Sequence, residues 1–346
     1  MKEFVLERIR KLKPYTASDV SEGEIKLDAQ ENPYELPDHI KLEIQNRIQD
    51  LSLNRYPSFE KSRMYKKLAD YAGCHPDKIL LGNGSDELIE LILLACGGPG
   101  RLVATAEPTF SMYRILSDLT GTSYKGFPLN EDFSLPVESL ISSGADIIFI
   151  TYPHNPTGNS FEISDIERVI EESGSLVVLD EAYYEFSKKS FVGMVKEYDN
   201  LLVLRTFSKA FSLAGIRAGY MVLPVNLSKD MKKAQLPYNF SVLNEIIIET
   251  VLDYREDALE SVEKLLSSRE KMYAQLKQIE GISPFESDAN FILMKIEKFE
   301  GVMASLKKHK IKAREFSDPN LKSFLRVTVG TEDENKNFLK ALREAE

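Results

Sequence analysis

Short apolar runs rich in β-branched residues alternate with amphipathic stretches through residues 78–223 of this 346-residue chain. Strands buried on both faces read as such runs, and a helix usually connects one parallel strand to the next. The alternation therefore predicts an α/β unit with a largely parallel sheet. We expect strands at 78–81, 102–106, 123–128, 146–151, 176–179, 201–205 and 220–223, with helices at 86–95, 110–120 and 164–172 among them.

The pattern changes near residue 240. Residues 244–279 form one long charged stretch with helical character, and two strand candidates follow at 290–296 and 324–329. A helix near 299–309 and a terminal helix accompany them. Few strands beside helices suggest a smaller α+β domain, to which the N-terminal segment returns. The expected division is a large domain at 34–245 and a small domain made of 1–33 and 246–346.

Composition and charge restrict the class of partner. The formal net charge is -10 and the pI is near 5.2. Nucleic acids and anionic membrane surfaces are met by basic protein faces, so we expect neither partner. An anionic substrate must then be bound by a few local arginines.

The chain start and the cysteines restrict the location and the type of site. The first residues are charged without the apolar core of a signal peptide, and no run approaches membrane-spanning length. The two cysteines, Cys74 and Cys96, lack metal-ligand spacing. We expect a cytoplasmic protein with free thiols and no metal site.

Lys209 is the first candidate for chemistry. It follows the apolar run 201–205, and the hydroxyls of Thr206 and Ser208 precede it, with Arg217 further along. A lysine at such a boundary is placed to form a Schiff base with an aldehyde cofactor. The hydroxyls and Arg217 would form a cup for the cofactor phosphate. The alternative is a solvated surface lysine. The residues at the other strand ends decide between these two interpretations of Lys209.

In open α/β sheets, ligands bind beyond the carboxyl ends of the strands. The first strand is followed by the glycine-rich segment 82–87, which leads directly into a helix. Gly84 permits a tight turn, and the free amides of Ser85 and Asp86 at the helix start would face a phosphate. A simple glycine turn with a helix N-cap is the alternative.

The strand ending at residue 106 is followed by a helix that offers Phe110 in its first turn. A flat apolar ring at this position could stack on a pyridine face, and Tyr113, one turn on, is a second candidate. The alternative for either ring is an ordinary aromatic side chain that packs the helix onto the sheet.

Two further strand ends carry polar residues. Asn155 lies in a turn bracketed by prolines, where its amide can donate to the 3-oxygen of a pyridoxal ring. We interpret the neighbouring His154 as a turn residue. Asp180 ends a buried strand, where a carboxylate is costly unless it meets a cation such as a protonated pyridine nitrogen. Tyr183 can reach the 3-oxygen beside Asn155. An Asx-type turn and a helix-capping acid are the alternatives.

Taken together, the segment 155–158, Asp180 with Tyr183, and Ser208-Lys209 with Arg217 resemble the class I/II aminotransferases of fold type I, which use pyridoxal 5′-phosphate (PLP). Within that family the chain is most similar to the histidinol-phosphate aminotransferases. That likeness is carried by segments at 28–34, 55–57, 82–87, 180–186, 206–211 and 325–330.

The resemblance implies a seven-stranded, mostly parallel sheet with one antiparallel strand, a small domain built from both termini, and a homodimer. Tyr56 matches a tyrosine that reaches the cofactor phosphate of the partner subunit, and Phe110 matches the ring-stacking aromatic. Lys209 would hold PLP and then act as the base, with Asp180 and Tyr183 as further catalytic residues. Gln30 departs from the family's common form of the segment 28–34.

The resemblance also implies the substrates. Histidinol phosphate and 2-oxoglutarate would be converted to imidazole acetol phosphate and glutamate, a step of histidine biosynthesis. Histidinol phosphate has no α-carboxylate, so Arg326 would bind both glutamate and the phosphate. A dianion needs more donors than a carboxylate does, and Tyr15 and Arg314 match positions that could supply them. Asn32 and Asn155 complete the expected substrate-binding residues.

Three alternatives stay open. A PLP-dependent decarboxylase of a phosphorylated amino acid would share the scaffold and the phosphate recognition, and would differ in which Cα bond is held perpendicular to the ring. An aminotransferase for aromatic amino acids would share the chemistry. A ligand-sensing module of the same fold usually comes fused to a DNA-binding domain, and no part of this chain is long or basic enough for one.

Overall fold

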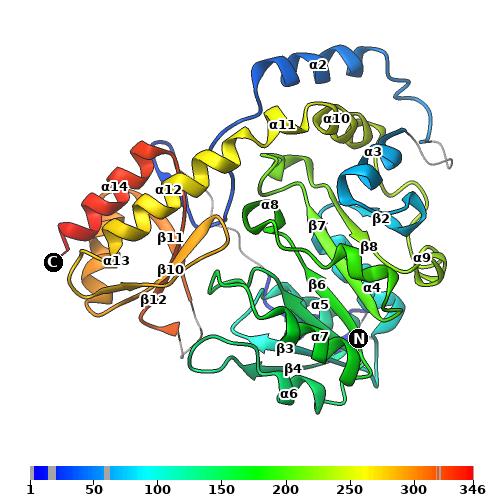
Figure 1. Cartoon of the computed structure of the whole chain (residues 1–346), viewed down its shortest axis with the longest axis horizontal. Coiled ribbons are helices and arrows are strands. Elements are labelled where there is room, and N and C mark those ends of the chain that lie inside the picture. The colour runs from blue at the N-terminus through cyan, green and yellow to red at the C-terminus, as the bar shows by residue number, and fades with distance from the viewer. Residues whose placement is uncertain (1–3, 15–20, 58–62, 317, 319–320, 346) are drawn as a thin grey trace.

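The structure is a computed structural model that describes residues 4–14, 21–57, 63–316, 318 and 321–345. A seven-stranded sheet with the order β2-β8-β7-β6-β5-β3-β4 forms its larger part (Figure 1). All neighbours in this sheet run parallel except β8, which is antiparallel to both β2 and β7. The strands are β2 (Ile79–Gly82), β3 (Leu102–Glu107), β4 (Ser123–Pro128), β5 (Ile147–Thr151), β6 (Leu176–Asp180), β7 (Leu201–Thr206) and β8 (Gly219–Val222). The expected mostly parallel sheet is confirmed.

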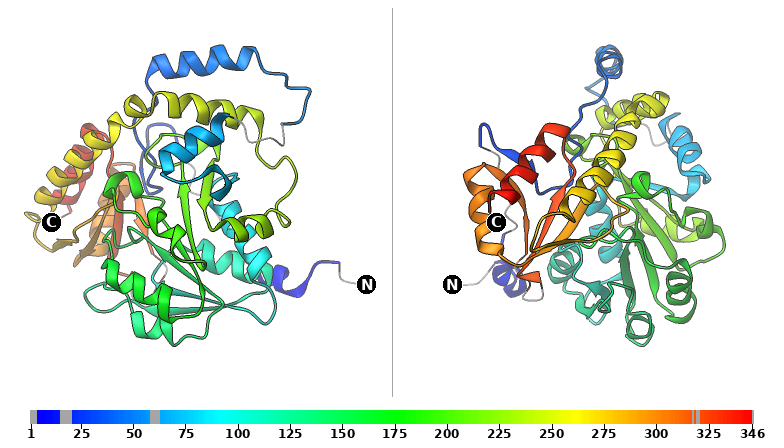
Figure 2. Two further views of the ribbon diagram at one scale, coloured as in Figure 1. Left: turned by 45° about the vertical axis from the view of Figure 1, so that its right-hand side comes forward. Right: turned by 60° about the vertical axis from the view of Figure 1, so that its left-hand side comes forward.

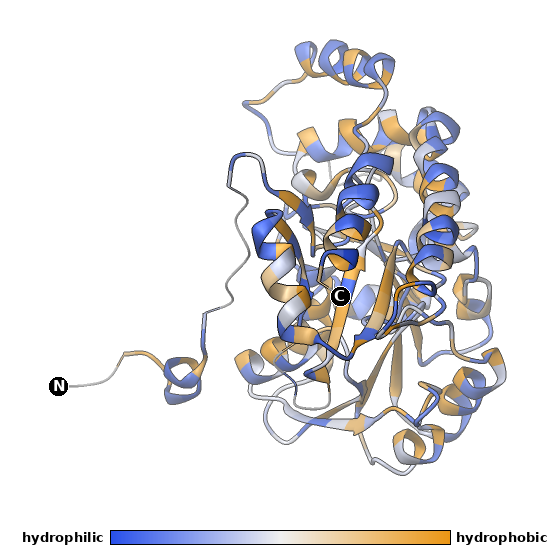
Figure 3. Cartoon of the chain, turned by 90° about the vertical axis from the view of Figure 1, so that its left-hand side faces the viewer, coloured by the Kyte–Doolittle hydropathy of each residue, from blue (hydrophilic) through white to orange (hydrophobic). Residues whose placement is uncertain are grey.

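Helices cover both faces of this sheet, and the core lies on both sides of it. Consecutive strand residues alternate between two apolar clusters: Val177 belongs to one and Val178 to the other, as the pleat of a strand requires. Figure 3 shows the strands as mainly hydrophobic and the surrounding helices as mixed. The covering helices include α4 (Ser85–Cys96), α5 (Met112–Thr120), α6 (Val137–Ile141), α7 (Ile163–Glu172), α8 (Tyr184–Ser187) and α9 (Val225–Met231).

A second sheet of five strands has the order β1-β11-β12-β10-β9. Its strands are β1 (Ile25–Leu27), β9 (Ile282–Pro284), β10 (Phe291–Ile296), β11 (Ile311–Glu315) and β12 (Phe324–Thr328). The helices α13 (Phe299–Lys308) and α14 (Glu332–Arg343) pack beside it (Figure 2). Because β1 pairs in parallel with β11, the N-terminal segment does return to the C-terminal part of the chain. The sequence pattern did not reveal β1, β9 or β11.

The stretch 244–279 is not one helix. It is divided into α10 (Val242–Asp253), α11 (Arg255–Ala258) and α12 (Glu260–Leu276). Tyr254, between the first two, leaves helical geometry at φ −113° and ψ 34°, and its ring meets His39 of α2 (Asp38–Gln49) edge-on. The stretch contains neither glycine nor proline. Packing against α2 therefore accompanies a break that local sequence does not signal.

The division into two domains remains a proposal, and we propose to move its second boundary. Buried residues of α10, such as Ile248 and Val251, belong to the same apolar cluster as Met64 and Leu68 of α3 (Arg63–Ala72). A boundary at 245/246 would cut this helix. A boundary near residue 259 would instead assign α10 and α11 to the large sheet. Among the described residues, no helix is long and apolar enough to cross a membrane.

Candidate active site

A small cavity lies at the carboxyl ends of the strands in the large sheet, and we call it the inner cavity. Its volume is about 120 Å³. It is lined by Gln30, Ser85, Asp86, Phe110, Thr151, Asn155, Asp180, Ala182, Tyr183, Thr206, Ser208, Lys209 and Arg217. The structure thus brings together most of the cofactor-binding residues expected from the sequence. Of those expected, Gly84 and Tyr56 do not line it.

One end of the inner cavity is built from hydroxyls and a guanidinium. Thr206 Oγ1 donates to Ser208 Oγ at 3.0 Å, and Arg217 Nη1 donates to the same Ser208 oxygen at 3.2 Å. The other Arg217 nitrogen, Nη2, pairs with Asp86 at 3.3 Å. A guanidinium beside two hydroxyls offers convergent hydrogen bonds to an anion such as a phosphate.

Gly84 leaves the space that this arrangement needs. Its φ is +83°, and a Cβ built on it would lie 2.6 Å from Arg217 Nη2. The helix α4 starts at the next residue, Ser85, so its first free amides lie at this end of the cavity. The positive end of the helix dipole favours a bound anion there. The residues present therefore fit the phosphate of a cofactor.

Asp180 provides a buried carboxylate in the same cavity. It is 3 % exposed, and burial raises its pKa to about 6. Its Oδ2 accepts a hydrogen bond from the hydroxyl of Tyr113 at 2.7 Å, and its Oδ1 accepts one from the amide of Ala182 at 3.2 Å. A carboxylate in such a dry place is stabilised by a cation, which a protonated pyridine nitrogen would supply.

The prediction that Tyr113 could stack on a pyridine face is wrong. Its ring is fully buried and stacks on Phe149 with the ring centroids 4.7 Å apart. Only its hydroxyl is directed to Asp180, and it also contacts Thr151 Oγ1 at 3.0 Å. Phe110, in contrast, lines the cavity and is the candidate left for stacking on a ring.

Lys209 presents an amine that is easily deprotonated. Its Nζ donates to the carbonyl oxygen of Ala29 at 2.7 Å. Burial, together with the nearby Arg326 cation, lowers the pKa of Lys209 to about 8. A neutral amine is the form that attacks an aldehyde or takes up a proton.

The loop after β5 holds Asn155 and His154. The Asn155 Oδ1 accepts a hydrogen bond from Arg326 Nη1. Burial lowers the pKa of His154 to about 4, and its Nε2 lies 2.9 Å from the carbonyl oxygen of Pro108. A neutral histidine that joins two loops is consistent with a structural role. Tyr183 is buried beside Phe291, with the ring centroids 5.2 Å apart, and burial raises the pKa of its hydroxyl.

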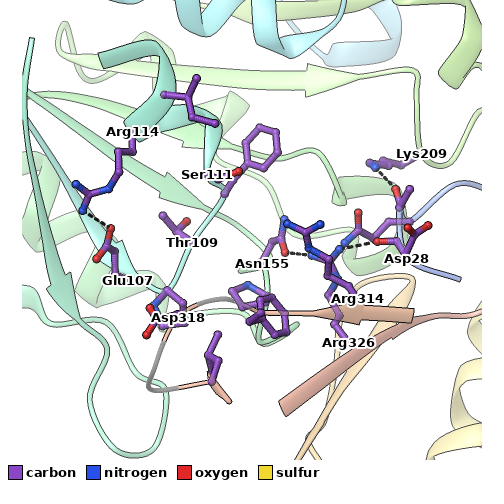
Figure 4. Close-up of a pocket in the computed structure, with 18 of the residues that line it drawn as sticks. Asp28, Glu107, Thr109, Ser111, Arg114, Asn155, Lys209, Arg314, Asp318 and Arg326 are labelled. Atoms are coloured by element: carbon purple, nitrogen blue, oxygen red, sulfur yellow. Dashed lines mark hydrogen bonds and ion pairs between the residues drawn. The ribbon is translucent and has the colours of Figure 1, made fainter. Parts of the chain in front are cut away.

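A larger cavity of about 590 Å³ opens from the inner one toward the small sheet, and we call it the outer cavity (Figure 4). Gln30, Phe110, Asn155 and Lys209 line both cavities. Figure 4 shows Arg314 and Arg326 on one side and the Glu107–Arg114 pair on the other. Arg114 Nη2 and Glu107 Oε1 form an ion pair at 3.2 Å. The sequence pattern did not single out either residue.

Two arginines face each other across the strands of the small sheet. Arg314 of β11 is directly opposite Arg326 of β12 in the antiparallel register. Like charges in this arrangement destabilise a sheet unless an anion lies between them. Arg326 is anchored, because its Nη2 donates to the carbonyl oxygen of Asp28 at 2.9 Å and its Nη1 donates to Asn155 Oδ1. Gln30 is buried with φ at 52°.

Two expected residues lie elsewhere, and a third, Tyr15, is outside the described residues. The amide nitrogen of Asn32 donates hydrogen bonds to the carbonyl oxygen of Ala210 at 3.0 Å and to Ser261 Oγ at 2.9 Å. Asn32 lines a separate cavity of about 290 Å³. Asn32 lines neither the inner nor the outer cavity, and its expected contact with substrate stays a prediction. Tyr56 is 78 % exposed.

Comparisons with known proteins agree with this geometry. The family model for aminotransferase class I and II matches residues 22–342. Histidinol-phosphate aminotransferase 2 of Nitrosococcus oceani is 38% identical over 99% of this chain and 97% of its own length. Histidinol-phosphate aminotransferase 1 of Carboxydothermus hydrogenoformans is 39% identical over 99% of this chain and 98% of its own.

A solved structure supports the fold. Histidinol-phosphate aminotransferase from Sinorhizobium meliloti, in complex with pyridoxal-5′-phosphate, has a TM-score of 0.89 and 21% identity. The match covers 100% of this chain and 98% of the other.

Proposed function

Because the chain belongs to the class I and II aminotransferase family, we propose that it transfers an amino group between histidinol phosphate and 2-oxoglutarate. The products are imidazole acetol phosphate and glutamate. The observation that carries the choice of substrate is the cross-strand pair of Arg314 and Arg326 in the outer cavity. Two guanidiniums suit a phosphate dianion, and the anchored Arg326 alone suits a carboxylate.

The cofactor of this enzyme is pyridoxal 5′-phosphate, which when bound supplies an electron sink for the charge left on the substrate Cα. In our proposal Ser85, Thr206, Ser208 and Arg217 hold its phosphate, and Phe110 stacks on its ring. Asn155 and Tyr183 contact its 3-oxygen. The fit of the inner cavity supports these roles, because Gly84 leaves room for the guanidinium of Arg217.

The catalytic residues have separate tasks. Lys209 holds the cofactor and then moves a proton to and from the substrate Cα, for which its lowered pKa suits it. The Asp180 carboxylate keeps the ring nitrogen protonated by pairing with it. Asp180 is buried and Lys209 is half-buried, which limits the access of water to the reacting atoms.

The alternatives receive less support. The two relatives of similar length named above are histidinol-phosphate aminotransferases, and the chain covers 97% and 98% of them. A decarboxylase would release carbon dioxide from an α-carboxylate, which histidinol phosphate lacks, and an aromatic aminotransferase needs no site for a phosphate dianion beside the cofactor.

We also propose a homodimer located in the cytoplasm. Tyr56 stacks on Tyr238 with the ring centroids 4.4 Å apart, yet remains 78 % exposed. Leu236 nearby in sequence is 73 % exposed. Exposed aromatic and apolar side chains of this kind suit a surface that a second copy covers. Sedimentation of the loaded protein at the mass of one chain would contradict the dimer.

The test of the proposed reaction is a substrate panel. The loaded protein is mixed with 2-oxoglutarate and, in separate reactions, with histidinol phosphate, phenylalanine, tyrosine or phosphothreonine. Glutamate formation and carbon dioxide release are followed together. We expect the fastest glutamate formation with histidinol phosphate. Carbon dioxide without glutamate would exclude the aminotransferase, and a higher kcat/KM with the aromatic amino acids would exclude the proposed substrate.

A further inference from the structure

We propose that Tyr113, supported by Thr151, is a positioning residue that orients the Asp180 carboxylate toward the ring nitrogen of the cofactor. This inference rests on the proposed function, since it assigns Asp180 to that nitrogen. It adds two residues that contact neither the cofactor phosphate nor the outer cavity. Tyr113 does not line the inner cavity, so its effect would pass through the carboxylate, whereas Thr151 also borders that cavity.

The direction of the hydrogen bonds follows from the number of protons available. The Tyr113 hydroxyl has one proton, and Asp180 Oδ2 at 2.7 Å is an acceptor when ionised. The tyrosine oxygen must then accept from Thr151, whose Oγ1 is 3.0 Å away. Each hydroxyl therefore donates toward the carboxylate. Thr109 Oγ1, 3.4 Å from Thr151 Oγ1, is a more distant member of the series.

Packing fixes the phenol where this donation occurs. The Tyr113 ring stacks on Phe149 of β5 with an interplanar angle of 13°, and Phe110 meets it edge-on at 5.7 Å. Both rings belong to elements that border the inner cavity. A hydroxyl on a ring held from two sides keeps its position without loss of further side-chain freedom on cofactor binding.

Burial makes the donor hard to replace. Tyr113, Thr151 and Asp180 are 0 %, 2 % and 3 % exposed. Bulk water has little access to Oδ2 if the phenol is removed, and an unsatisfied buried acceptor is costly. The carboxylate would then turn or take up a proton, and in either case its pairing with a ring nitrogen weakens. In Tyr113→Phe the aromatic ring stays in place, because the substitution removes only the hydroxyl oxygen.

The experiment uses cofactor-free protein and two probes without an aldehyde. Pyridoxine 5′-phosphate carries the ring nitrogen, and its 1-deaza analogue has CH at that position. Titration calorimetry measures both dissociation constants. We expect the wild-type protein to prefer the nitrogen-bearing probe, and Tyr113→Phe to lower this preference about tenfold, as one hydrogen bond to a charged group implies. Affinity for the deaza probe should change little.

Matched variants separate positioning from general damage. Thr151→Val should lower the preference by a smaller factor, on the order of threefold, whereas Thr151→Ser should retain it. Tyr198→Phe removes a hydroxyl that bonds Glu171 at the surface and should leave both affinities unchanged. An equal loss for both probes in Tyr113→Phe, or an unchanged ratio, would overturn the inference. A wild-type protein that binds neither probe would instead overturn the proposed function, and with it this inference.

Discussion

The inner and outer cavities share Lys209 but are built in different ways. The inner cavity is formed largely by residues that follow strands of the large sheet, and of its charged groups Asp180 is buried and Lys209 is half-buried. The outer cavity lies between two sheets and takes Arg314 and Arg326 from the smaller one. The cofactor site therefore depends mainly on the large sheet, with Gln30 as its contribution from the segment that follows β1. The substrate site depends also on how the second sheet is placed.

The largest expected effect is at the inner cavity. Lys209→Ala should abolish turnover and the visible absorbance of the loaded protein, because no other described amine lines that cavity. The loss should be several orders of magnitude, as expected when the residue that moves the proton is removed. Glutamate formation and the absorbance spectrum are measured. Lys196→Ala, at an exposed lysine near Glu197, is the control. Retention of both signals would refute the central role of Lys209.

The outer cavity should respond in a graded and substrate-dependent way. Arg326→Ala should lower kcat/KM for both half-reactions by about 100-fold, the worth of charge-assisted hydrogen bonds. Arg314→Ala should lower kcat/KM about tenfold with the phosphate substrate and less with glutamate, because Arg314 is expected to bind the additional negative charge of the phosphate. Single-turnover kinetics of each half-reaction measure the difference. Lys312→Ala on the same strand, beside Glu24, is the control. Equal losses in Arg314→Ala would contradict the division of tasks.

The smallest effect is a shift in pH dependence that links the two cavities. Burial, with help from Arg326, lowers the pKa of Lys209 to about 8. Because only the neutral amine attacks the aldehyde, capture of cofactor by the cofactor-free protein should accelerate as pH rises and level off above about 8. Arg326→Ala should move this plateau to higher pH. Stopped-flow absorbance measures the rate, and a wild-type rate that keeps rising to pH values typical of free lysine would exclude the lowered pKa.

Most of the inner cavity could be predicted because of a rule about sheets. The carboxyl ends of parallel strands meet at one edge, so Asn155, Asp180 and Thr206, each near a strand end, come together regardless of other details. Thr151, the last residue of β5, carries the same signal. Tyr113 carried no such signal. Its hydroxyl reaches Asp180 only because α5 lies against the sheet at this point.

The sequence by itself determined the alternation of strands and helices, the family of the chain and the groups around Lys209. These follow from local periodicity and from the geometry that any parallel sheet imposes. Tertiary structure decided three other features: the breaks at Tyr254 and Leu259, the commitment of Asn32 to Ala210 and Ser261, and the register that opposes Arg314 to Arg326. Each depends on contacts between segments far apart in the chain, and no local pattern encodes the distance between such segments.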